Sequence, residues 1–524
     1  MIELSLAEIA DVVGGRLHGA DGSSAVTGSV EFDTRKIGPG GLFVALPGER
    51  VDGHDFAAKA VAAGAVAVLA GREVDAPAIV VPPLPEGQAH ERSVALAGDT
   101  DGSGAAVLAA LAKLAGHVVG RLAAEGLTVV ALTGSSGKTS TKDVIAQLLE
   151  PMGPTVAPPG SFNSELGHPW TALRADHATK YLVLEMSARG TGHIADAAAI
   201  TPPRIGAVLN VGSAHVGEFG SREAIAKAKG ELVEALPSAE AGGVAVLNLD
   251  DPLVAAMASR TSARVVGVGE TASAQVRAAD ITLDAEARAS FRLITPDGEA
   301  PVTLPLHGEH HVGNALSAAA IALELGATPA EVAQRLSALE RRSAHRMAVT
   351  TRADGVTVLN DAYNANPESV RAALKALASM RRTGRRAWAV LGVMGELGAD
   401  SVTEHDSIGR LVVRLNIDKL VVVGDEAAPM HQGASQEGSW NEESVLVPDG
   451  DAAVALLHDQ LRPGDVVLVK ASNAAGLWHV AEALLAPSED SKDSENSENS
   501  EDSEDAAQSV SPSPSSERSN GGHA

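Results

Sequence analysis

The sequence predicts an α/β protein of three domains: a small α/β N-terminal domain, then two domains that are each built on a doubly wound, mostly parallel sheet. Three observations predict this fold. The chain has 524 residues, which is enough for about three domains. Beyond about residue 105, short apolar strands alternate with helical patterns, as in parallel sheets. Several of these strands also end directly in polar residues, which indicates ligand sites at the carboxyl edges of the sheets.

The composition excludes several classes of function. A net charge of -26 and an aromatic content of 2% argue against a nucleic-acid-binding protein and against anionic membrane surfaces. The absence of cysteine excludes disulfides and thiolate metal sites. The N-terminus has neither a basic segment nor a long apolar run. We therefore expect a cytoplasmic protein with no signal peptide and no membrane insertion.

The N-terminal domain is expected to cover residues 1–100. A Gly/Pro turn at 38–41 precedes a predicted strand at 42–46, and Thr34 and Arg35 lie just before that turn. A hydroxyl and a guanidinium there could bind a diphosphate. From these residues alone, a capped turn with a solvated arginine explains the pattern equally well.

The central domain, 101–340, begins with the most specific motif of the chain. An apolar strand leads into Thr133-Gly134-Ser135-Ser136-Gly137-Lys138-Thr139, and a helix is expected to follow to Leu149. The two glycines let the backbone turn its N–H groups inward, the lysine offers a charge to terminal phosphates, and the last threonine can ligate Mg²⁺. The sequence therefore predicts a P-loop ATPase-like domain, although Leu132 replaces the first glycine of the general pattern. A turn that merely connects strand and helix is the disfavoured alternative.

Three more charged or titratable side chains of the central domain indicate a site at the carboxyl edge of the same predicted sheet. Glu185 ends the predicted strand 181–184, and His215 follows the predicted strand 207–211. In the predicted helix 222–236, Lys229 shares the apolar stripe, whereas Lys227 lies on the opposite side. Buried charges need partners, so these residues are expected to interact. A solvated Glu185 and a Lys229 that extends to the helix edge remain the alternatives.

Further polar residues follow in the chain. Asn163 and Ser164 lie in a polar loop, and Asn314 opens an Ala-rich helix, where a packing amide is the alternative. The C-terminal domain, 341–486, is expected to be Rossmann-like. It contains Arg346, the strand 356–359 followed by Asp361, Tyr363 and Asn364, and the strand 465–469 followed by Lys470. Residues 487–524 hold ten acidic and two basic residues with few apolar ones, which predicts a disordered acidic tail.

These motifs, over about residues 25–480, resemble the Mur ligase family. The resemblance implies that ATP is bound by Thr133 to Thr139 together with Asn314, Arg346, Asp361, Tyr363 and Asn364. It implies that the UDP substrate is bound by Thr34, Arg35, Asn163 and Ser164. It also implies a Mg²⁺ site formed by Thr139, Glu185, His215 and a carbamylated Lys229, with catalytic roles for Lys138, Lys229 and His215.

Within the family, the motifs Ala226-Lys-Ala-Lys-Gly-Glu231 and Asp361-Ala-Tyr-Asn-Ala-Asn-Pro367 are most similar to the member that adds D-alanyl-D-alanine to UDP-N-acetylmuramoyl-tripeptide. The Asp-Asn-Pro-Arg motif of the diaminopimelate-adding member is absent. The resemblance implies an ATP-dependent ligase that acts through an acyl phosphate in peptidoglycan precursor synthesis, and hence in cell wall biogenesis, cell shape and cell division. We expect a monomer. The alternatives are a folylpolyglutamate synthase, a P-loop GTPase or kinase, and a non-catalytic nucleotide-binding relative.

Overall fold

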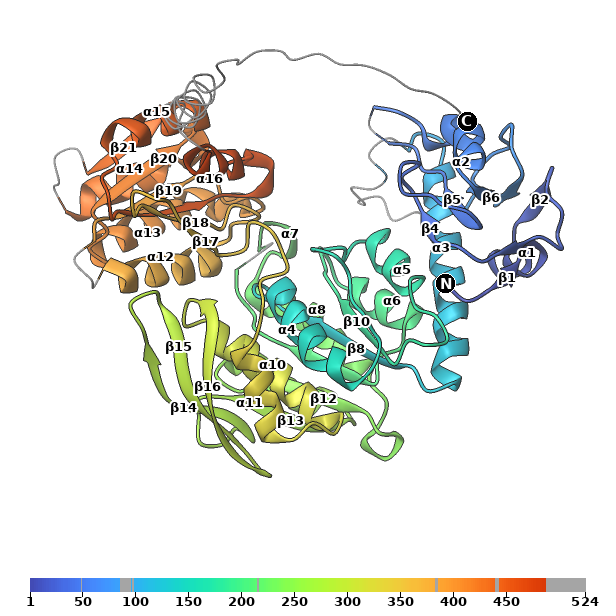
Figure 1. The fold of residues 1–524 in the computed structure, drawn as a ribbon, viewed down its shortest axis with the longest axis horizontal. Helices are drawn as coiled ribbons and strands as arrows, with labels where there is room; N and C mark the ends of the chain where they lie inside the picture. The colour runs from blue at the N-terminus through green and yellow to red at the C-terminus, as the bar shows by residue number, and fades with distance from the viewer. Residues whose placement is uncertain are drawn as a thin grey trace, which may run out of the picture.

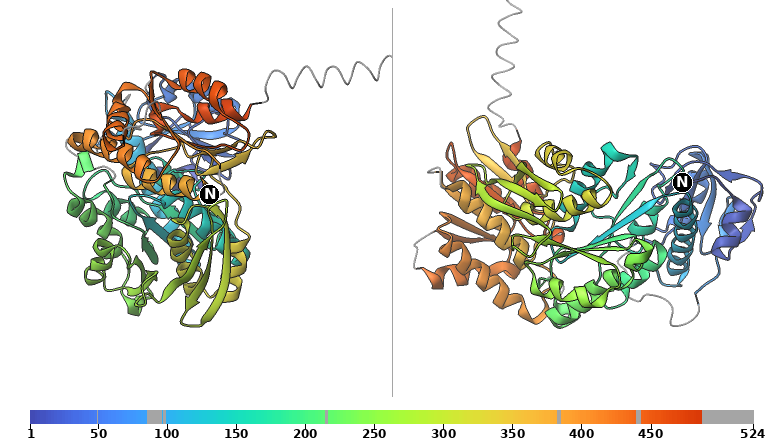
Figure 2. Two further views of the ribbon diagram at one scale, coloured as in Figure 1. Left: turned by 90° about the vertical axis from the view of Figure 1, so that its left-hand side faces the viewer. Right: turned by 90° about the horizontal axis from the view of Figure 1, so that it is seen from below.

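The computed structural model describes residues 1–48, 50–84, 96, 99–213, 216–381, 385–438 and 443–486. His215 and the expected acidic tail from 487 lie outside these residues. Three bodies, each with its own sheet, follow one another in space in the order of the chain, with the central body between the other two (Figure 1; Figure 2, right).

The N-terminal body is built on a five-stranded sheet in the order β2-β7-β6-β5-β4, in which only β2 is antiparallel, and on a two-stranded sheet of β1 and β3. The predicted strand 42–46 is observed two residues shorter at its carboxyl end, as β5. The elements are β1 (Leu4–Ser5), α1 (Leu6–Val13), β2 (Arg16–His18), β3 (Ala25–Val26), β4 (Val30–Glu31), β5 (Gly41–Val44), η1 (Gly53–Phe56), α2 (Ala57–Ala62), β6 (Ala65–Ala70) and β7 (Ala78–Val80).

Helix α3 (Ser103–Ala124) joins the N-terminal and central bodies. Among the described residues it is the one helix long and apolar enough to cross a membrane, and 61% of its most apolar window is buried inside the protein. Its apolar side chains share one core cluster with Leu69 of β6 and Leu182 of the central sheet. Packing against both bodies therefore accounts for its apolar composition.

The central body holds a nine-stranded sheet in the order β16-β15-β14-β13-β12-β11-β8-β10-β9. Strands β8 to β14 pair in parallel, and β15 and β16 extend the sheet as antiparallel strands. The strands are β8 (Thr128–Thr133), β9 (Thr155–Val156), β10 (Tyr181–Glu185), β11 (Ile205–Val208), β12 (Val244–Asn248), β13 (Arg264–Gly269), β14 (Val276–Leu283), β15 (Arg288–Thr295) and β16 (Gly298–His307).

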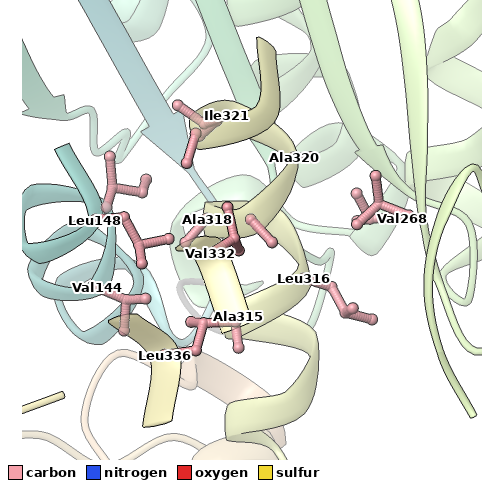
Figure 3. Packing of buried hydrophobic residues seen from close by; sticks show 14 of the residues in the cluster. Val144, Leu148, Val268, Ala315, Leu316, Ala318, Ala320, Ile321, Val332 and Leu336 are labelled. Atoms are coloured by element: carbon pink, nitrogen blue, oxygen red, sulfur yellow. The ribbon is translucent and has the colours of Figure 1, made fainter. Parts of the chain in front are cut away.

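The helices of the central body cover both faces of this sheet. They are α4 (Lys138–Leu149), η3 (Glu150–Met152), α5 (Gly167–Ala172), α6 (His193–Ile200), α7 (Val216–Phe219), α8 (Arg222–Glu234), η4 (Ala239–Ala241), α9 (Pro252–Ala255), η5 (Ala256–Arg260), α10 (His311–Glu324) and α11 (Pro329–Ser337). Helix α10 packs beside α4 and against the sheet, with Ala318 and Ile321 in the same cluster as Val144, Val268 and Leu336 (Figure 3). Alanines let α10 approach its neighbours closely, so α4 is fixed by burial along its length.

The C-terminal body holds a six-stranded sheet in the order β17-β18-β22-β19-β20-β21, in which only β17 is antiparallel. Alternate strand residues face two separate apolar clusters: Leu359 and Leu468 pack with α12 to α14, and Val358 and Val467 pack with α15 and α16. The sheet is therefore buried on both faces, as a doubly wound sheet requires. The elements are β17 (Ala348–Thr351), β18 (Thr357–Asn360), α12 (Pro367–Arg381), β19 (Ala387–Leu391), η6 (Gly398–Asp400), α13 (Ser401–Arg414), β20 (Lys419–Val423), η7 (Asp425–Ala427), α14 (Ala428–Glu437), β21 (Ser444–Val447), α15 (Gly450–Gln460), β22 (Val466–Lys470), η8 (Asn473–Ala475) and α16 (Trp478–Leu485).

Candidate active site

The glycine-rich loop lies at the carboxyl end of β8, between β10 and β11, and leads into α4. Gly137 has φ +78°, and a Cβ there would lie 2.7 Å from Oδ1 of Asn314, so only glycine fits. Lys138 bends back and donates from Nζ to the carbonyl oxygen of Gly134 at 2.8 Å. Burial lowers the pKa of Lys138, while the charges of Glu185 and Glu396 oppose that shift.

Asn210, two residues after the end of β11, supports this loop. Its Oδ1 accepts from the backbone N–H groups of Ser135 at 3.0 Å and Ser136 at 2.9 Å, and its Nδ2 donates to the carbonyl oxygen of Ser136 at 3.2 Å. The predicted strand 207–211 was misplaced, since β11 ends at Val208 and the chain then turns onto the loop. Nothing in the sequence singles out this asparagine among others, because the contact spans about 75 residues.

Glu185 lies directly below the loop and is 1% exposed. The hydroxyl of Thr139 donates to its Oε2 at 3.0 Å, and Asn163 donates to its Oε1 at 2.6 Å. Asn163 is held there because the neighbouring Phe162 packs on Trp170, with ring centroids 4.8 Å apart. Glu185 therefore does not reach solvent, and the alternative of a solvated carboxylate is wrong.

Lys229 is buried, with 4% exposure, as the spacing of its helix predicts, and Lys227 is exposed. Burial and then the charge of Lys138 place the pKa of Lys229 well below its ordinary value. Within the described residues its amine has no hydrogen-bond or ion-pair partner. No group of three or more His, Cys, Asp or Glu side chains suited to a metal occurs in the described ranges, from which His215 is missing. The oxygen donors present, Thr139 and Glu185, are of the kind that Mg²⁺ prefers.

The C-terminal body closes over this loop. Arg346 donates from Nη2 to Oγ1 of Thr139 at 3.2 Å, its guanidinium lies 4.1 Å from the ring centroid of Tyr363, and its buried Nε has no hydrogen-bond partner. Lys470 donates to Oδ2 of Asp361 at 2.6 Å and to the carbonyl oxygen of Asn364 at 2.8 Å. Arg346, just before β17, therefore reaches the phosphate loop, whereas Lys470 is held within the C-terminal body.

A cavity of about 580 Å³ lies between the two bodies. The residues predicted from the sequence that line it are Ser135, Ser136, Gly137, Lys138, Thr139, Asn163, Ser164, Glu185, Asn314, Arg346, Asp361, Tyr363 and Asn364. Thr133, Gly134 and Lys229 do not line it, and His215 lies outside the described residues. Residues from the central and C-terminal bodies therefore line one cavity. The sequence pattern alone does not predict where this cavity lies.

Thr34 and Arg35 do not line this cavity either. They belong to the N-terminal body, where the guanidinium of Arg35 pairs with Asp33 at 2.8 Å and lowers the pKa of Asp33 to about 2. The guanidinium is largely solvated, with its side chain 85% exposed. Any binding by these two residues therefore occurs away from the phosphate loop.

His310 and His311 line the cavity although the sequence pattern assigns them no role. Their rings lie 4.2 Å apart, and neither buried Nδ1 has a hydrogen-bond partner among the described residues. Burial lowers the pKa of His310 to about 4, and that of His311 well below its ordinary value. Both imidazoles are therefore neutral at physiological pH.

Family models match three consecutive stretches of the chain: the Mur ligase family catalytic domain over 28–115, the Mur ligase middle domain over 132–322, and the Mur ligase glutamate ligase domain over 345–473. The UDP-N-acetylmuramoyl-tripeptide--D-alanyl-D-alanine ligase of Mycobacterium tuberculosis is 57% identical over 506 residues, which cover 93% of this chain and 98% of the relative. The chain belongs to the Mur ligase family. It is an ATP-dependent ligase that forms amide bonds.

Other Mur ligases extend the comparison. The Escherichia coli ligase of the same name is 34% identical and covers 92% of this chain and 99% of its own length. The crystal structure of MurF from Acinetobacter baumannii has a TM-score of 0.78 at 29% identity and covers 92% of this chain and 99% of its own. MurF from Thermotoga maritima, solved in complex with ADP, has a TM-score of 0.71 at 28% identity and covers 87% and 97%. The Mur ligase fold therefore extends through all three bodies.

Proposed function

We propose that this Mur ligase joins the amine of D-alanyl-D-alanine to the terminal carboxylate of UDP-N-acetylmuramoyl-tripeptide, with ATP forming an acyl phosphate on that carboxylate. The observation that carries the proposal is the near full-length similarity to ligases of that name, together with a phosphate loop that faces a second nucleotide-binding-like sheet across one cavity. In this role the enzyme acts as a cytoplasmic monomer in cell wall synthesis.

The geometry supports different roles for the two bodies around the cavity. The loop 133–139 cradles the phosphates, and Lys138 offsets the charge of the terminal one. Arg346, Tyr363, Asp361 and Asn364 hold the nucleotide from the C-terminal side, and Asn314 packs against the loop from below. Because both sheets contribute, the site forms only when the two bodies are together, which excludes the water that would hydrolyse an acyl phosphate.

The substrate carboxylate is expected beside Asn163 and Ser164, which line the same cavity. Ser164 also accepts from the N–H of Gly167 at 3.2 Å, which fixes the start of α5. Thr34 and Arg35 in the N-terminal body would hold the diphosphate of the UDP group, in keeping with the length of such a substrate. The substrate would then reach from the N-terminal body to the phosphate loop.

The oxygen donors at the loop are of a kind that suits a Mg²⁺ ion. Thr139 and Glu185 would supply oxygen, His215 would add its imidazole, and a carbamate on Lys229 would add more oxygen. The lowered pKa of Lys229 favours the neutral amine, which is the form that adds to CO₂ with loss of one proton. Mg²⁺ bound there would offset the charge of the ATP phosphates.

The test is ADP release by the purified protein with ATP, Mg²⁺ and UDP-N-acetylmuramoyl-tripeptide. We expect turnover that depends on D-alanyl-D-alanine and that falls by about 10² or more in Lys138→Ala, because the positive charge at the transferred phosphate is removed. Glutamate in place of the dipeptide should give no turnover. Turnover with glutamate alone would favour a folylpolyglutamate synthase, and none with any acceptor would favour a non-catalytic relative.

A further inference from the structure

A second charged pair lines the cavity away from the residues assigned above. Arg189 follows β10 in the central body, and Glu396 follows β19 in the C-terminal body. Nη2 of Arg189 lies 3.7 Å from Oε1 of Glu396, and both side chains remain partly exposed to the cavity. The pair therefore places one positive and one negative group, from different bodies, side by side in the site.

The backbone that carries Glu396 is held in an unusual conformation. Glu396 has φ +61°, which a non-glycine residue adopts only under constraint. The two residues before it are anchored, because the N–H of Gly395 donates to Oγ of Ser472 at 2.7 Å and the N–H of Met394 donates to Nε2 of His405 at 3.0 Å. The loop thus presents the carboxylate at a fixed position, where strain is maintained by the fold.

Glu396 also shares its cavity with the phosphate loop. The carboxylate of Glu396 and the amine of Lys138 line the same space, together with Asn163 and Ser164. Under the proposed function, this space is where the terminal phosphate of ATP and the substrate carboxylate meet. An acceptor amine must approach this same place in order to attack the acyl group.

We propose that Glu396 and Arg189 form the acceptor subsite, in which Glu396 binds the ammonium of the dipeptide and Arg189 binds its carboxylate. This inference rests on the proposed function and deepens it. A zwitterionic dipeptide carries one charge of each sign, so both residues exchange their partner for an equivalent one and no charge is left unpaired. The pair therefore selects acceptors with a free amine and a free carboxylate.

The chemistry of the two steps separates binding of the acceptor from activation of the donor. Hydroxylamine is small and uncharged, so it captures an acyl phosphate as a hydroxamate without using either ionic contact. In that capture, its nitrogen bonds to the acyl carbon, the carbon–oxygen bond to phosphate breaks, and phosphate leaves with the electron pair while nitrogen loses a proton. Hydroxamate formation therefore reports donor activation alone.

The experiment compares the full chain with Glu396→Gln, Arg189→Met and the exposed control Glu240→Gln. We expect Glu396→Gln to raise the KM for D-alanyl-D-alanine about tenfold or more, because one charged hydrogen bond is lost, while hydroxamate formation stays within about twofold of wild type. Arg189→Met should reduce by a similar factor the preference for D-alanyl-D-alanine over its C-terminal amide. Glu240→Gln should match wild type in all assays.

Two results would overturn the inference. An unchanged KM and unchanged amide discrimination would exclude contact with the acceptor. A parallel loss of hydroxamate and ligation would show that the pair only holds the two bodies together. If wild type forms no hydroxamate, or forms it without dipeptide-dependent ADP release, the proposed function itself fails.

Discussion

Burial controls the charge state of three lysines at the site. Lys229 and Lys470 are buried and Lys138 is half-buried in the wall of the cavity, and desolvation lowers the pKa of each. Lys470 is compensated by Asp361 and Lys138 by a loop carbonyl, whereas Lys229 has no such partner among the described residues. A lysine without compensation is the one that favours its neutral form, which distinguishes Lys229 from the other two.

At the residue scale, Asn210 is expected to control the shape of the phosphate loop. Asn210→Ala removes the acceptor of two loop N–H groups and should raise the KM for ATP about tenfold, as expected for one to two kcal/mol. Asn210→Asp keeps an acceptor but adds a negative charge beside the phosphates, so its KM should rise at least as much. Steady-state kinetics check this, and a normal KM in both variants would contradict it.

His168 gives the residue-scale prediction for pH. It is 3% exposed, its Nε2 lies 2.8 Å from Oγ1 of Thr201, and burial lowers its pKa from 6.5 to about 4. The unfolded chain therefore takes up this proton first, so the stability contribution is complete above about pH 6.5 and is lost as pH falls towards 4. The loss amounts to about 3 kcal/mol.

His168→Gln keeps a hydrogen-bonding side chain that does not titrate in this range. Unfolding by urea, followed by fluorescence of the neighbouring Trp170, should therefore show a smaller loss of stability between pH 6.5 and 4 in the variant than in wild type. Equal losses in the two proteins would exclude a buried neutral His168.

At the scale of elements, the segment from Leu339 to Met347 connects the central and C-terminal bodies and is attached to α4. Oγ of Ser343 donates to Asp143 at 2.6 Å, Gln147 exchanges two hydrogen bonds with the backbone of Glu340, and Arg342 pairs with Glu150. Immediately afterwards, His345 and Met347 have φ +53° and +47° on either side of Arg346. The left-handed turn directs Arg346 onto the phosphate loop.

Glycine and alanine at position 345 measure the strain of this turn. Both remove the contact between the His345 ring and Asn360, but only glycine adopts φ +53° without steric cost. His345→Gly should therefore be more stable than His345→Ala by about 1 kcal/mol. At the exposed helical Ser435, glycine should instead be less stable than alanine by about the same amount. The measurement is the free energy of unfolding of the four variants by a chemical denaturant. If the alanine variant were the more stable one at both positions, the backbone at His345 would not be strained.

Local features of the fold could be read from the sequence, and contacts between bodies could not. The strand, turn and helix around Gly137 follow from residues within about ten positions, and the inward direction of Lys229 follows from helical spacing. Asn210, Arg189 and Glu396 depend on how distant elements pack, for which their residue types give no signal. The end of β11 was likewise set by a tertiary contact rather than by its apolar pattern.

For the whole molecule, the central and C-terminal bodies meet through a small set of close contacts. Oε1 of Glu368 accepts from the N–H of Ser213 at 2.8 Å and from its hydroxyl at 2.9 Å. Nδ2 of Asn366 donates to the carbonyl oxygen of Ser135 at 3.4 Å. Glu368 and Asn366 both lie at the start of α12. The position of this one helix is therefore coupled directly to the phosphate loop.

Two glycines also approach each other closely between these bodies. A Cβ on Gly217 of α7 would lie 2.6 Å from the backbone N of Gly398, in the loop that carries Glu396. Because backbone atoms on both sides are fixed, the added methyl group cannot be accommodated without moving the bodies apart. Gly217→Ala should therefore shift the molecule towards an open arrangement, with a larger radius of gyration in X-ray scattering and a kcat lowered about tenfold or more.

Gly120→Ala is the matched control, since a Cβ at this exposed position of α3 has no neighbour within 4 Å. It should leave both the radius of gyration and kcat unchanged.

The open arrangement should also slow formation of the acyl phosphate, because Arg346 leaves Thr139 when the bodies separate. Gly217→Ala should therefore reduce hydroxamate formation and ligation together, whereas Glu396→Gln should raise only the KM for the dipeptide and keep hydroxamate formation. If Gly217→Ala kept normal hydroxamate formation with an enlarged radius, closure of the two bodies would not be needed to activate the substrate carboxylate.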